Sequence, residues 1–157
     1  MSVSFGLALI VVFAGTGTII CIEDVRHHRV YNWQLLLSAI PLVALIVTWS
    51  AVAQAWSMSA WAAVGVVGFV AIYALLALIS GGQLGSGDVW IAGIVGLVLG
   101  ALQPEALIVG WAVPFALAAL PSIGLWIWRG AGSRFAFAPF IIYSAPLSVG
   151  VALLMGY

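Results

Sequence analysis

The chain has 157 residues, of which 66% are hydrophobic and only 5% are charged. An average soluble domain carries about 25% charged residues, and four basic plus four acidic side chains cannot cover the surface of a folded domain of this size. The composition therefore excludes a soluble enzyme and a disordered linker. Because there is no basic patch, it also excludes a nucleic-acid-binding protein. It predicts an all-α protein that crosses the lipid bilayer several times.

Six apolar runs have lengths near the roughly 20 residues that span a bilayer core. In chain order they cover residues 5–22, 31–49, 56–79, 89–102, 106–128 and 135–157. The gaps between the runs are short, so we expect six transmembrane helices in one polytopic membrane domain over residues 1–157, with no extramembrane domain.

The fourth run, residues 89–102, is unusually short. A helix of this length rises about 21 Å, less than the ~30 Å hydrocarbon core. The glycine-rich segment Gly81–Asp88 precedes it, and irregular backbone at membrane depth is tolerated only inside protein or beside a wet cavity. We expect this segment to dip inward and to place Asp88 at the edge of the core. Further along, Gly96 and Gly100 have the spacing that permits close packing against another helix.

The basic residues indicate how the chain is oriented. Arg26 and Arg29 follow the first run, and Arg129 and Arg134 follow the fifth. With six helices these two gaps lie on one side of the membrane, which the positive-inside rule makes cytoplasmic. We therefore expect a cytoplasmic-membrane protein with both termini outside.

Two aspartates are the main candidates for chemistry. Asp24 ends the first run among basic neighbours, and its simplest interpretation is a solvated acid at the membrane surface. Asp88 has no cation within ten residues, which makes it a functional candidate, although it could also act as the N-cap of the fourth helix. The predicted topology places both acids on the cytoplasmic side. Two carboxylates that meet at a partly dry site share a proton, so one can act as an acid and the other as a base, as in aspartic proteases.

Other catalytic arrangements lack their parts. The single cysteine, Cys21, cannot form a multi-cysteine zinc site and is expected to be a small buried side chain. His27 and His28 are adjacent and would point to different helix faces, so a joint metal site is not expected. Glu105 is expected to be a solvated loop acid. We expect no metal and no cofactor, and therefore an activity that is insensitive to chelators.

Three segments resemble the motifs of one family. Asp24–Trp33 is similar to the motif Asp-x-Arg-x-x-x-Ile-Pro-Asn-Trp, and Gly85–Val89 matches Gly-x-Gly-Asp-Val. Phe137–Phe140 is a weaker match to the late segment Pro-Phe-Gly-Pro-Phe. On these motifs the chain resembles the prepilin peptidases, or type IV leader peptidases, which are membrane aspartic proteases of the Gly-x-Gly-Asp class.

The resemblance implies that Asp24 and Asp88 are the catalytic pair. The implied partners are the lipid bilayer and prepilin-like substrates, whose short basic leader precedes a hydrophobic helix and is cut at the cytoplasmic face. Around the pair we expect Gly85 and Gly87 to shape the loop. The candidate contacts with substrate or lipid headgroups are Arg26, Arg29 and Asn32.

The chain also departs from the family pattern. Trp90 stands where many members carry lysine, and Tyr31 replaces the usual proline. The paired Cys-x-x-Cys motifs of the long members are missing, so the short, peptidase-only branch is the better comparison and N-methylation is not expected. Two alternatives stay open. One is a non-catalytic pilus-assembly protein on the same scaffold, for which Trp90 is the main support. The other is a small proton-coupled transporter that uses Asp88 as a carboxylate relay.

Overall fold

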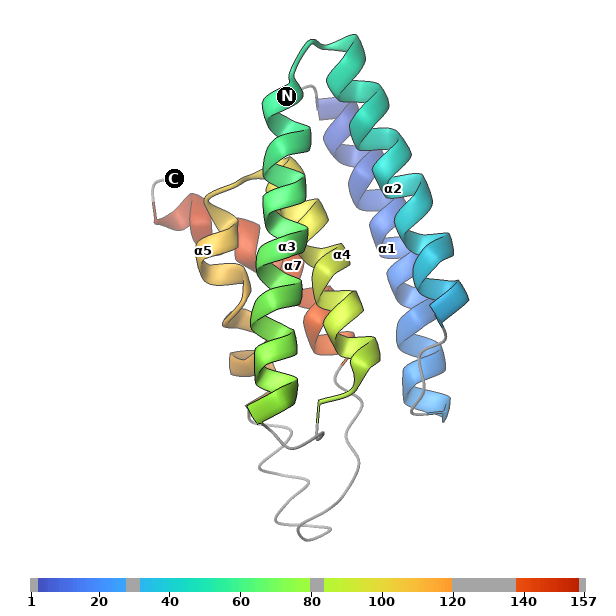
Figure 1. Cartoon of the computed structure of the whole chain (residues 1–157). Coiled ribbons are helices and arrows are strands. Elements are labelled where there is room, and N and C mark those ends of the chain that lie inside the picture. The colour runs from blue at the N-terminus through green and yellow to red at the C-terminus, as the bar shows by residue number, and fades with distance from the viewer. Residues whose placement is uncertain (1–2, 28–31, 80–83, 120–137, 156–157) are drawn as a thin grey trace, which may run out of the picture.

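The computed structural model describes residues 3–27, 32–79, 84–119 and 138–155, and in this part of the chain every regular element is an α-helix (Figure 1). This confirms the predicted all-α fold class. The helices are α1 (Val3–His27), α2 (Asn32–Val52), α3 (Trp56–Ile79), α4 (Ser86–Leu102), α5 (Ala106–Gly110) and α7 (Ala138–Leu154).

Among the described residues, three helices are long and apolar enough to cross a membrane by themselves, and these are α1, α2 and α3. The other apolar helical stretches of the described residues are shorter and cover residues 86–102, 106–119 and 138–154, the second of them with a turn at residues 111–112. Six membrane crossings therefore remain a prediction, whereas a membrane protein with at least three membrane-length helices agrees with the structure.

Helix α4 lies at the centre of the bundle. It contacts α1, α2, α3, α5 and α7, and every residue from Ile91 to Ala101 except Ile94 is buried. A helix that is apolar on all sides is stable only when other elements surround it, and here the neighbouring helices do so. This enclosure accounts for the short length of α4, because its backbone is covered by protein rather than by lipid.

Glycines bring α3 and α4 into the closest contact in the bundle. A Cβ atom on Gly96 would overlap the backbone carbonyl of Gly65, and a Cβ on Gly100 would overlap that of Trp61. The predicted close packing through Gly96 and Gly100 is confirmed, and α3 is the helix that they contact.

Two helices extend further towards the candidate site than the sequence predicted. Helix α1 continues to His27, five residues beyond the predicted end of the first run, so Asp24 lies within its last turns. Helix α4 begins at Ser86, so Asp88 lies in its first turn and not before it. Of the predicted inward segment Gly81–Asp88, residues 81–83 lie outside the described part of the chain, and residues 86–88 belong to the first turn of α4 rather than to a loop. The third helix has the predicted bounds.

The prediction of one continuous helix over residues 106–128 is wrong in its described part. Helix α5 ends at Gly110, a turn follows, and helical structure resumes at residues 113–119. The physical reason is Pro114, which has no N–H to donate to the carbonyl four residues earlier. In the turn, the N–H of Ala112 donates to the carbonyl of Val109, three residues back, at 3.1 Å. Residues 120–128 lie outside the described part.

One end of the bundle gathers the segments that carry the predicted motifs. In Figure 1, α1 ends and α4 and α7 begin near the lower end of the view, whereas the N-terminus of the chain lies at the upper end. The direction of these three helices therefore brings Asp24, Asp88 and the start of α7 to the same end of the molecule.

Candidate active site

Asp24 is a buried carboxylate near the end of α1. Its side chain is only 8% exposed, and its Oδ2 accepts a hydrogen bond of 3.2 Å from the backbone N–H of Ala138. Because α1 continues past Asp24, this residue falls on the same inward face as the buried Gly17 and Ile20. The interpretation of Asp24 as a solvated acid is therefore wrong.

Asp88 is half-buried in the first turn of α4. Its Oδ2 accepts a hydrogen bond of 3.2 Å from the backbone N–H of Gly85, and its own N–H donates to the carbonyl of Gly85 at 3.1 Å. Gly85 occupies the N-cap position, and Asp88 is the third residue of the helix. The N-cap interpretation is corrected accordingly, since the Asp88 carboxylate closes the start of the helix from inside its first turn.

The two carboxylates lie close enough for the charge of Asp24 to act on Asp88. They come from helices that are not neighbours in the chain, and each is fixed by a backbone amide. The fold thus brings together the two acids that the sequence singled out. Paired carboxylates at a partly buried site can hold one proton between them and can activate water.

The sequence did not single out two residues that lie near the carboxylate pair. Ala138 contributes only its backbone N–H, and the weak match of Phe137–Phe140 to a family motif was the only signal for it. Tyr73 of α3 is fully buried, lies within electrostatic range of Asp88 and donates a long hydrogen bond of 3.5 Å to the carbonyl of Trp111. A tyrosine in the middle of an apolar run gave no signal.

The other predicted site residues have different outcomes. Arg26 is exposed at the end of α1, and Asn32 is the first residue of α2. Arg29 lies outside the described residues. Gly85 has an ordinary φ of −71°, and a Cβ there would meet Oδ2 of Asp88 at 3.4 Å, so the loop does not require glycine on steric grounds. Gly87 is half-buried in the first turn of α4.

Trp90 does not contribute to the carboxylate pair. It follows Asp88 by two residues, which places it on a different face of α4, and its side chain is 57% exposed. Its ring therefore faces the surroundings of the bundle.

Within the described ranges, no group of three or more His, Cys, Asp or Glu residues is placed to hold a metal ion. Cys21 is buried, as predicted.

These features define a helical membrane protein with a pair of carboxylates at one end of its bundle. Residues 11–156 match the model of the type IV leader peptidase family, and the chain belongs to this family. The family is one of proteases, so the match also places the chain among the peptide-bond hydrolases. No curated protein and no solved structure matches the chain.

Proposed function

We propose that the protein is a membrane-embedded aspartic endopeptidase that removes the short basic leader from prepilin-like precursors. The observation that carries the proposal is that Asp24 and Asp88, two acids from separate helices at one end of an apolar bundle, lie within electrostatic range of each other, each held by a backbone amide. Family membership supports the protease class, and the carboxylate pair supports the aspartic type.

In the proposed mechanism the two carboxylates share one proton. The ionised member takes a proton from a water molecule, whose oxygen attacks the carbonyl carbon of the cleaved peptide bond. The protonated member donates a hydrogen bond to the carbonyl oxygen and stabilises the negative charge that develops there. The tetrahedral intermediate then breaks at the C–N bond, and the leaving amine receives a proton from the pair. Because the protons belong to the pair, neither residue is assigned a fixed role.

The proposed substrate follows from the surroundings of the pair. The acids lie at the end of the bundle that also carries Arg26, and the positive-inside rule assigns this end to the cytoplasm. A precursor with a hydrophobic helix would lie in the bilayer beside the enzyme, with its leader at the cytoplasmic face. The proposal therefore places the cleaved bond between the leader and the membrane helix, and both termini of the enzyme outside.

The test is cleavage of a candidate prepilin by the purified protein in detergent or lipid, followed by sequencing of the new N-terminus. Asp24→Asn and Asp88→Asn should each abolish cleavage while the protein stays folded by circular dichroism. Glu105→Gln is the matched control, because it also replaces a carboxylate by an amide but at an exposed position. Cleavage at the wild-type rate by either aspartate variant would contradict the paired mechanism.

The same variants separate the alternatives. A proton-coupled transporter would depend on Asp88 and tolerate Asp24→Asn. A non-catalytic assembly protein would cleave nothing, and neither substitution would change its binding to other pilus proteins. The burial of Asp24 and its electrostatic influence on Asp88 favour the paired chemistry over a relay that uses Asp88 alone.

A further inference from the structure

Tyr73 of α3 is a fully buried polar side chain that the proposed reaction does not use. Its hydroxyl donates a 3.5 Å hydrogen bond to the carbonyl of Trp111, in the turn that interrupts the helical stretch 106–119. The centroid of its ring lies 5.4 Å from that of Phe115, beyond Pro114. Tyr73 therefore contacts this stretch, which we name the broken helix, on both sides of Pro114.

A further aromatic ring of α3 extends this contact. Phe69 stacks on Tyr73, with ring centroids 6.3 Å apart and an interplanar angle of 8°. A Cβ on Gly110, the last residue of α5, would lie 3.1 Å from Cζ of Phe69. Residues 106–119 carry no charged side chain, so α3 and the broken helix meet in an uncharged layer of rings. We name this layer the aromatic wall and define it by Phe69, Tyr73 and Phe115.

The aromatic wall approaches Asp88 from the side of α3. Tyr73 lies within electrostatic range of Asp88. The packing of the helices agrees with this, because α3 and α4 run in opposite directions and Gly93 of α4 lies against Val70 of α3 (Figure 1). About one turn further towards the candidate site, Tyr73 and Asp88 therefore come to a similar level.

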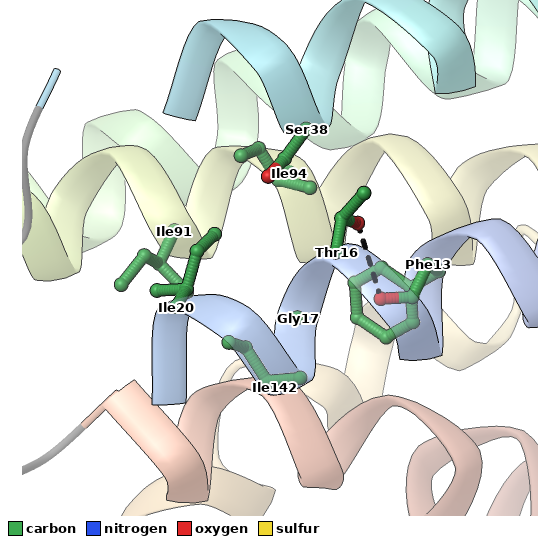
Figure 2. Close-up of a pocket in the computed structure, with 8 residues that line it drawn as sticks. All are labelled: Phe13, Thr16, Gly17, Ile20, Ser38, Ile91, Ile94 and Ile142. Carbon is green, nitrogen blue, oxygen red and sulfur yellow. Dashed lines mark hydrogen bonds between the residues drawn. The ribbon is translucent and has the colours of Figure 1, made fainter. Parts of the chain in front are cut away.

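The aromatic wall and Asp24 approach Asp88 from different sides of α4. Figure 2 shows Ile20 of α1 and Ile91 of α4 on the wall of one small apolar cavity. Ile91 and Gly93 are two residues apart, so α1 and α3 meet different faces of α4. In the described chain, the titratable side chains in range of Asp88 come from α1 and α3, whereas the broken helix and α7 carry no charged residue.

We propose that Tyr73 is a positioning residue for the proposed reaction, because it fixes the broken helix against α3 and thereby keeps water from one side of Asp88. This inference rests on the proposed function. Two carboxylates share a proton only where their surroundings disfavour two negative charges, and an uncharged wall does so. A buried hydroxyl in such a wall needs a partner, and the interrupted helix supplies one in the carbonyl of Trp111. Tyr73 thus acts through Asp88 and not on the substrate.

The first experiment disrupts the aromatic wall and records the pH dependence of cleavage. Tyr73→Ala and Phe115→Ala admit water beside Asp88, which favours the ionised carboxylate. The alkaline limb of the kcat/KM profile should therefore move to lower pH by roughly one unit in both variants. Tyr73→Phe should move the limb less, since it keeps the ring and loses only the hydrogen bond to Trp111.

Tyr143→Ala is the matched control, because it removes a tyrosine ring of α7 that is 49% exposed. It should leave the limb in place. If Tyr73→Ala and Phe115→Ala are folded and the limb stays at the wild-type pH, the inference is overturned and the proposed function is intact, even where kcat falls at every pH. Absence of cleavage by the wild-type protein would instead contradict the proposed function.

A second experiment does not depend on turnover. The chain has two aspartates, so ¹³C labelling of aspartate side-chain carboxyls in an Asp24→Asn protein marks Asp88 alone. The NMR titration midpoint of this carboxyl should lie roughly one pH unit lower with Tyr73→Ala than without it, because water beside the carboxyl favours its charged form. Tyr143→Ala should leave the midpoint unchanged. Equal midpoints in folded proteins with and without Tyr73→Ala would overturn the inference.

Discussion

The backbone N–H of Ala138 donates a 3.2 Å hydrogen bond to Oδ2 of Asp24, across 114 positions of the chain. It joins the first described residue of α7 to the last turns of α1, in a buried environment. A hydrogen bond from a backbone amide cannot be changed by a side-chain substitution, so it fixes the direction of the Asp24 carboxylate whatever residue occupies position 138, provided that residue has an N–H. Ala138, which belongs to the third predicted motif, therefore orients the carboxylate of Asp24, which belongs to the first.

Removal of this amide should impair catalysis. Ala138→Pro deletes the N–H, and hydrogen bonds to charged groups contribute about 1.5–3 kcal/mol. We expect kcat/KM to fall at least about tenfold, while Ala138→Gly, which keeps the amide, should stay near the wild-type value. The measurement is leader cleavage, with thermal unfolding in detergent as the check on folding. A folded Ala138→Pro protein with wild-type activity would remove Ala138 from the site.

The pH dependence of cleavage should have two limbs. The mechanism needs one proton on the Asp24–Asp88 pair, so activity should fall at low pH, where both carboxyls are protonated, and at high pH, where both are ionised. The measurement is kcat/KM across the pH range at constant ionic strength, with unfolding recorded at each pH. A profile with only an acidic limb would indicate a single essential carboxylate.

The glycine contact between α3 and α4 should be needed for stability. Gly96→Ala places a Cβ against the backbone of Gly65, which cannot move aside as a side chain can, and overpacking typically costs about 1–3 kcal/mol. Gly68→Ala is the matched control on α3, because a Cβ there meets nothing within 4 Å. It should be neutral or stabilise the helix by up to about 1 kcal/mol. The melting temperature in detergent measures both, and equal values would contradict the packing described.

Trp90 should be dispensable for cleavage. Since its side chain is exposed and lies on a different face of α4 from Asp88, Trp90→Lys should leave kcat/KM within about twofold of wild type. A strong gain of activity in Trp90→Lys would instead mean that the tryptophan suppresses catalysis and would favour the non-catalytic alternative.

Much of this architecture follows from hydropathy alone. The all-α class and the bounds of α3 could be predicted, because apolar runs are visible in the sequence, and isolated charges also indicated that Asp24 and Asp88 lie within electrostatic range of each other. The burial of Asp24 could not. Helix α1 is apolar around most of its surface, so the sequence does not indicate which face turns inward.

The break after α5 and the Ala138 contact were missed for different reasons. Pro114 lies within an apolar run, and hydropathy weighs side chains without regard to a missing N–H. The contact with Asp24 is made by a backbone amide, which every residue except proline carries, so no residue type marks it.

The helices that carry the two acids are packed to different extents. Glycine contacts hold α4 tightly against α3, whereas α1, which carries Asp24, touches α4 at few points. Helix α1 packs mainly on α2 and α7, so the separation of the carboxylates depends on how these contacts hold α1 relative to α4, and the hydrogen bond from Ala138 limits the movement of Asp24. Changes in bilayer thickness or lateral pressure that tilt α1 would alter the reactivity of the pair without altering any residue in it.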